Sequence, residues 1–124
     1  MRFLIVVLFS LTAALQLLEG QTDTERPEAP QLRYVSVDPL NSNTIIRWAP
    51  GLSEDVAGYI VYSYVDNEGF SLDTIHNPLA TEYRLTGTGP TYFSETFVVA
   101  AFDYAGNVSP LSNSISTIHL TVAA

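Results

Sequence analysis

The stretch VVAAFDYAGNVSP, residues 98–110, sets the pattern from which the rest of the chain can be interpreted. It starts as an apolar run of strand-forming residues and changes at Asp103 into a segment rich in turn-forming residues. The Asp103 carboxylate can accept backbone N–H groups two residues on, and Gly106 can adopt the left-handed conformation that a short hairpin needs. We therefore predict a strand over 96–103 that ends in a hairpin at 103–107.

On both sides of this stretch the chain consists of short segments with apolar residues at alternate positions, separated by turn residues at a spacing of about ten residues. Within the second segment Ile46 and Trp48 share one face, while Arg47 points the other way. The residues 66–69, DNEG, are expected to form a turn in which the glycine takes the positive φ. The predicted strands are 32–37, 43–48, 57–65, 70–75, 81–86, 96–103 and 117–122.

Four segments together resemble a fibronectin type III domain of the bacterial extracellular kind: Ala29-Pro30, Ile46-x-Trp48, SEDVAGYIVY (53–62) and VVAAFDYAGNVSP (98–110). The resemblance covers residues 29–122. It implies an all-β fold, a seven-stranded antiparallel immunoglobulin-like sandwich. One departure is Glu95, which stands where the family usually has a tyrosine, so Tyr92 or Phe93 is expected to replace that tyrosine in the packing.

The first twenty residues, MRFLIVVLFSLTAALQLLEG, have the pattern of a secretory signal, with one positive charge followed by an apolar core. This core is shorter than the roughly 20 residues of a membrane-spanning helix. We predict cleavage after Gly20, with an uncleaved signal anchor as the alternative. The predicted organisation is a signal peptide over 1–20, a polar linker over 21–29 and one domain over 30–122.

Composition restricts the partners and the chemistry. The chain has a net charge of −8 and contains no lysine, so it would repel phosphate backbones and we expect no nucleic-acid partner. It contains no cysteine, which excludes a disulfide scaffold and a thiolate metal site. The predicted localisation is secreted or at the extracellular cell surface, with membrane contact only through the signal segment during export.

We predict no catalytic residue, no metal and no cofactor. The two histidines, His76 in a loop and His119 on the outer face of the last predicted strand, are expected to be exposed, and no hydrolase or phosphate-binding motif occurs. Around Asp103 the local supply of one carboxylate and one amide falls short of the about six oxygens that calcium requires. A calcium ion shared with Glu54 or Asp55 is the alternative.

Two short motifs match modification sites. Asn107-Val108-Ser109 fits the N-glycosylation pattern, but Pro110 follows it and the sequence is of bacterial type, so we do not expect modification there. Asp73-Thr74-Ile75 resembles an O-glycosylation acceptor that some bacteria use on exported proteins, although matches of three residues arise easily by chance.

Alternation along two strands indicates a surface that could bind a partner. If the core contains Tyr59, Val61, Phe97, Val99 and Ala101, the opposite face carries Ile60, Tyr62, Tyr64, Val98, Ala100 and Phe102. Large apolar patches are seldom left uncovered, and tyrosine is favoured at interfaces. We therefore predict binding through Tyr62, Tyr64 and Phe102; the alternative is that tyrosines simply suit exposed strands.

The sequence predicts an exported, non-catalytic binding or spacer module of a bacterial cell-surface or secreted protein. Its expected partners are protein or glycan at the cell surface, or neighbouring domains of the same type. The alternative is an accessory N-terminal domain of a longer secreted enzyme, such as a polysaccharide hydrolase.

Overall fold

The computed structural model describes residues 23–38, 40–86 and 94–117. The predicted signal peptide, its cleavage position, Tyr92, Phe93 and His119 lie outside these residues. In the described part of the chain, no helix is long and apolar enough to cross a membrane.

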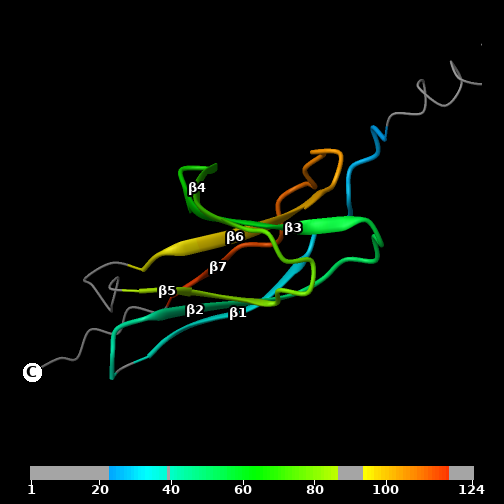
Figure 1. Cartoon of the computed structure of the whole chain (residues 1–124). Helices are drawn as coiled ribbons and strands as arrows, with labels where there is room; N and C mark the ends of the chain where they lie inside the picture. The colour runs from blue at the N-terminus through cyan, green and yellow to red at the C-terminus, as the bar shows by residue number, and fades with distance from the viewer. Residues whose placement is uncertain (1–22, 39, 87–93, 118–124) are drawn as a thin grey trace, which may run out of the picture.

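Within the described residues, seven strands form two antiparallel layers, as predicted (Figure 1). One layer has the order β1-β2-β5, and the other has the order β4-β3-β6-β7. The strands are β1 (Gln31–Val37), β2 (Thr44–Ala49), β3 (Val56–Val65), β4 (Glu68–Ile75), β5 (Glu82–Leu85), β6 (Thr96–Asp103) and β7 (Ile115–Ser116).

The core lies between the two layers and is built by alternation. Ile46 and Trp48 are buried on β2, whereas Arg47 between them is about half exposed and pairs with Glu82 on β5 at 3.6 Å. The rings of Trp48 and Tyr59 meet across the layers with centroids 5.3 Å apart. Such an aromatic pair contributes roughly 0.5–1.5 kcal/mol beyond the area that it buries. The other members of the core cluster are Leu32, Ile46, Val56, Val61, Phe97, Val99 and Ala101, which confirms the predicted core of the larger layer.

The turn between β3 and β4 differs in detail from the prediction. Its two central residues are Asp66 and Asn67, with φ of 51° and 64°, and Gly69 already belongs to β4. Two consecutive residues with positive φ give the turn a twist that matches the flanking strands, and Asp and Asn tolerate this conformation better than most residues. The glycine is therefore not the residue that makes the turn.

The last strand of the described residues, β7, consists of Ile115 and Ser116, paired with Phe97 and Thr96 of β6. Of the predicted strand 117–122, residues 118–122 lie outside the described part. Before β7 the chain already follows β6, because the backbone N–H groups of Ser109 and Ser112 donate to the carbonyls of Ala101 and Val99. The hydroxyls of the same two serines accept the N–H groups of Ala101 and Val99. Serine side chains thus replace part of the backbone ladder, which alternation of apolar residues does not reveal.

Residues 23–30, here called the N-terminal strap, pack against the domain. Pro27 and Pro30 are buried, and the Arg26 Nε donates to the Val108 carbonyl at 2.8 Å. Glu28 is held twice, because its N–H donates to Ser53 Oγ at 2.7 Å and its carboxylate accepts the Leu52 N–H at 2.8 Å. The predicted linker 21–29 therefore makes contacts, from Asp23 onward, that its polar composition did not indicate.

Candidate functional site

The outer face of the larger layer carries the residues that the sequence singled out for binding. Tyr62, Tyr64 and Phe102 are half-buried, as is Ile60; these four residues are here called the aromatic face. The strand register places Tyr62 opposite Val98, and Gly58 opposite Phe102. The sequence also expected Val98 and Ala100 to be part of the outward patch, but their side chains are 2% and 0% exposed. The accessible apolar surface is therefore a narrow line along β3 and not a broad patch.

Two rings of the aromatic face lie over glycines. A Cβ atom on Gly58 would lie 2.7 Å from the Phe102 Cζ, and one on Gly69 would lie 3.4 Å from the Tyr62 Cδ1. Aromatic rings that cover cross-strand glycines shield the exposed backbone, and the backbone in turn fixes the rings. At one end the imidazole of His76 meets Phe102 edge-on, with ring centroids 5.6 Å apart. Desolvation raises the pKa of Tyr62 above its usual value.

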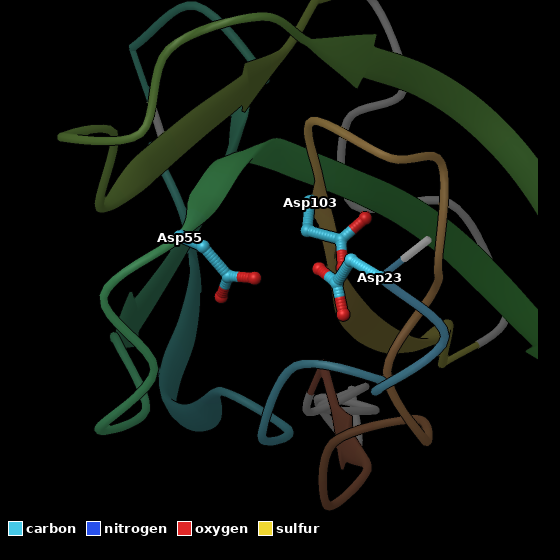
Figure 2. Close-up of side chains that lie close together, drawn as sticks. All are labelled: Asp23, Asp55 and Asp103. Atoms are coloured by element: carbon cyan, nitrogen blue, oxygen red, sulfur yellow. The ribbon is translucent and has the colours of Figure 1, made fainter. Parts of the chain in front are cut away.

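A second group of polar side chains lies at one end of the sandwich. Asp23, Asp55 and Asp103 come from the strap, the loop before β3 and the end of β6, and their carboxylate oxygens approach within 4.8 Å of one another (Figure 2). Asp103 is buried, whereas the other two are exposed. We call these three residues the carboxylate cluster. The sequence does not point to Asp23, because the strap has the polar composition of a linker.

Asp103 organises the hairpin that follows β6, as the sequence predicted. Its Oδ1 accepts the N–H groups of Ala105 and Asn107 at 3.0 and 2.8 Å, and its Oδ2 accepts Asn107 Nδ2 at 2.9 Å. Gly106 has φ of 91°, the left-handed conformation that was expected. Burial alone would raise the pKa of Asp103, but the hydrogen bonds from Asn107, Ala105 and Asp23 outweigh burial and lower it.

The pKa of Asp23 is shifted in the opposite direction, upward. The N–H of Glu25 donates to the Asp23 carboxylate and lowers its pKa, but desolvation and the neighbouring Asp55 and Asp103 carboxylates together outweigh that bond and raise the pKa. The proximity of Asp55 to Asp103 is the condition under which the sequence allowed a shared calcium ion. Because both oxygens of Asp103 already accept hydrogen bonds, the absence of a metal remains our prediction.

The other residues named from the sequence are not members of these two groups, although His76 contacts Phe102 and Asn107 bonds Asp103. His76 is exposed in the loop after β4, as expected. Asn107 Nδ2 donates to the Asp23 carbonyl at 3.0 Å as well as to Asp103, and Ser109 is 3% exposed, so the Asn107-Val108-Ser109 motif is held inside the hairpin. Thr74 of the Asp73-Thr74-Ile75 motif is exposed on β4.

An open hollow of about 580 Å³ lies at the end of the sandwich where β6 begins, lined on its apolar side by Leu72, Leu85 and Phe97. Its lining includes Ser94, which adjoins residues outside the described part of the chain. We therefore assign no site to it.

Comparison with solved structures supports the architecture. No family model and no curated protein matches the sequence. Among solved structures, an Fn3-like protein from Clostridium thermocellum is similar, with a TM-score of 0.62 and 17% identity. The match covers 81% of this chain and 100% of that protein. The chain has the fibronectin type III fold.

The same fold is found in parts of larger enzymes. A β-1,2-glucanase from Parabacteroides distasonis matches 81% of this chain with a TM-score of 0.62 and 23% identity, and the spore cortex lytic enzyme SleM from Clostridium perfringens matches 73% with a TM-score of 0.58 and 18% identity. The matched parts are 14% and 28% of those two chains. The fibronectin type III unit thus spans a small part of each enzyme.

Proposed function

We propose that the protein is an exported, non-catalytic binding or spacer module of a bacterial cell-surface or secreted protein. The observation that carries this proposal is the match of one fold to an isolated Fn3-like protein and to minor parts of two larger enzymes. A unit that recurs in such different surroundings is suited to holding or contacting other parts of a protein. This step is an analogy of fold, because function depends on the site and not on the fold.

The absence of catalysis is part of the proposal, and the carboxylate cluster supports it. Retaining glycoside hydrolysis needs two carboxyl groups about 5–5.5 Å apart, one as nucleophile and one as acid, facing a sugar. The cluster has a similar separation, but Asp103 is buried and both its oxygens accept hydrogen bonds from the hairpin. The hollow beside Asp55 is only about 330 Å³ and is lined by Glu25, Arg26, Ser53 and Glu54 as well. A nucleophile that orders its own loop is poorly placed to attack a substrate.

The second candidate function is an accessory N-terminal domain of a longer secreted enzyme such as a polysaccharide hydrolase. The matches to the glucanase and to the lytic enzyme favour it, because the unit accompanies a larger part in both. Export is common to both candidates.

One experiment tests export and size together. An antibody against the domain, applied to cell, surface and medium fractions of the source bacterium, should detect the protein at the surface or in the medium. A band of the size of this chain supports the module, whereas a much larger band that also hydrolyses a polysaccharide supports the accessory domain. A signal confined to the cytoplasm would contradict both. The purified protein should release no reducing sugar from polysaccharides.

A further inference from the structure

The aromatic face has a shape that suits a linear ligand. Phe102 lies opposite Gly58, and Tyr62 follows four residues further along β3, which is roughly 13 Å at the usual rise per residue. Ile60 lies between them on the same face. Because Val98 and Ala100 are buried, the line does not widen toward β6. A stable protein interface needs about 800 Å² on each partner, which a narrow line of half-buried side chains does not offer.

Hydroxyl groups flank this line on one side. Ser71 and Thr74 of β4 pair with Tyr62 and Ile60, so they share the outer face, and both are exposed. β4 is the edge strand of its layer and has β3 as its one neighbour among the described strands. A ligand lying on the rings can therefore reach these hydroxyls from the open side.

Charge restricts the ligand further. The outward residues of β3 and β6 and their partners Ser71 and Thr74 carry no carboxylate and no arginine, in a chain with a net charge of −8. Polymers rich in phosphate or uronate would be repelled. Sugar rings offer an apolar C–H surface for stacking and a rim of hydroxyls for hydrogen bonding, and this combination matches rings beside hydroxyls.

We propose that the aromatic face binds an uncharged, extended polysaccharide, whose sugar rings stack on Tyr62 and Phe102 and whose hydroxyls reach Ser71 and Thr74. This proposal rests on the proposed function of a binding module and names its ligand class. The rings are held in place before binding by Gly58 and Gly69, so little side-chain entropy is lost when a ligand binds.

The test is affinity electrophoresis of the exported, purified protein through gels that contain one polysaccharide each. The neutral probes are mixed-linkage β-glucan, xylan and α-mannan, and the charged probe is polygalacturonate. At least one neutral polymer should retard the protein, and polygalacturonate should not. Tyr62→Leu and Phe102→Leu, which keep apolar volume but remove the ring, should each weaken retardation by roughly tenfold, as expected for a binding hot spot.

Two further variants separate binding from folding. Tyr104→Ala removes a tyrosine that is 78% exposed on the hairpin, away from the face, and should bind as the parent does. The double variant Ser71→Ala with Thr74→Val alters only exposed side chains and should weaken retardation several-fold with an unchanged melting temperature. If this double variant and both ring variants bind as the parent does, the face is not the site.

The remaining outcomes distinguish the two proposals. If no neutral polymer retards the protein, but Tyr62→Leu abolishes self-association in sedimentation, the ligand class is wrong and the binding-module function stands. If neither sugar binding nor association depends on the face, the polysaccharide proposal and the binding role of this face both fail, and only the spacer role stands. If polygalacturonate retards the protein as strongly as a neutral polymer does, the claim that the ligand is uncharged is wrong, and the claim that the face binds polysaccharide stands.

Discussion

At the scale of single residues, two glycines have different effects on the same sheet. Gly58 lies where β3, Phe102 and the Ile75 carbonyl meet, and an added Cβ would overlap that carbonyl oxygen at 2.0 Å. At Gly69 the nearest atom would be the Tyr62 Cδ1 at 3.4 Å, an ordinary contact. The fold therefore requires a residue without a Cβ atom at position 58, whereas position 69 has room for a Cβ atom.

We expect Gly58→Ala to lower the free energy of unfolding by about 1–3 kcal/mol, the usual cost of forcing extra atoms into a packed site. Gly69→Ala is the matched control and should change stability by less than about 0.5 kcal/mol. Urea melts of both variants and the parent measure the difference. Equal stabilities for the two variants would show that the strand register at Gly58 is wrong.

At the scale of elements, alternation predicted the strand segments and their inward face well. Tyr59 and Val61 are buried and Arg47 is exposed because each strand has one face toward the opposite layer. Alternation failed where polar groups make the contacts, as in the serine-bonded segment before β7. It also predicted that Ala100 is exposed, which is wrong, because Ala100 is buried. A central strand can be buried on both faces by the side chains beside it.

The candidate sites were only partly predictable for the same reason. The hairpin role of Asp103 follows from local turn chemistry, and the structure confirms it. The approach of Asp23 to Asp55 and Asp103 depends on where the strap docks, and neither apolar periodicity nor a motif indicates that. The positions of Tyr62, Tyr64 and Phe102 on one face follow from the strand period. That the rings of Tyr62 and Phe102 lie over glycines follows only from the register.

The β6 hairpin and the strap respond oppositely to pH. The pKa of Asp103 is lowered on folding, so its charged form contributes stability above its ordinary pKa, and this contribution is lost as the pH falls through the lowered folded value. The pKa of Asp23 is raised, so its charge opposes folding at neutral pH, and this cost is relieved as the pH falls through the raised folded value toward the ordinary one.

Two isosteric variants should separate these effects. Asp103→Asn should lower the melting temperature at neutral pH, and its deficit should shrink only when the pH falls from neutral to below the ordinary aspartate pKa of 3.8. Asp23→Asn should leave the melting temperature unchanged or raise it at neutral pH, because it removes a charge that faces Asp55 and Asp103. Thermal melts across that pH range measure both. A loss of stability in Asp23→Asn as large as in Asp103→Asn would contradict the opposite shifts.

At the scale of the whole molecule, the strap decides where the folded unit begins. Its polar contacts reach two separate segments. Arg26 bonds Val108 and the Asp23 carbonyl accepts Asn107 in the hairpin after β6, and Glu28 bonds Leu52 and Ser53 in the loop before β3. The buried Pro27 adds an apolar contact in the same region. The strap thus holds the hairpin after β6 and the loop before β3 at the same end of the sandwich.

If the strap is part of the domain, a chain that starts at Pro30 should be less stable than one that starts at Gln21. Each hydrogen bond contributes a net of roughly 0.5–1.5 kcal/mol, so the loss should be about 2 kcal/mol, since most of these bonds are exposed. In a domain of this size that is a fall of several degrees in melting temperature. Arg26→Ala should reproduce part of the fall, while Thr24→Ala, at an exposed position in the same strap, should not. If the shorter chain melts with the longer one, residues 23–29 are a linker after all and the folded unit begins at Pro30.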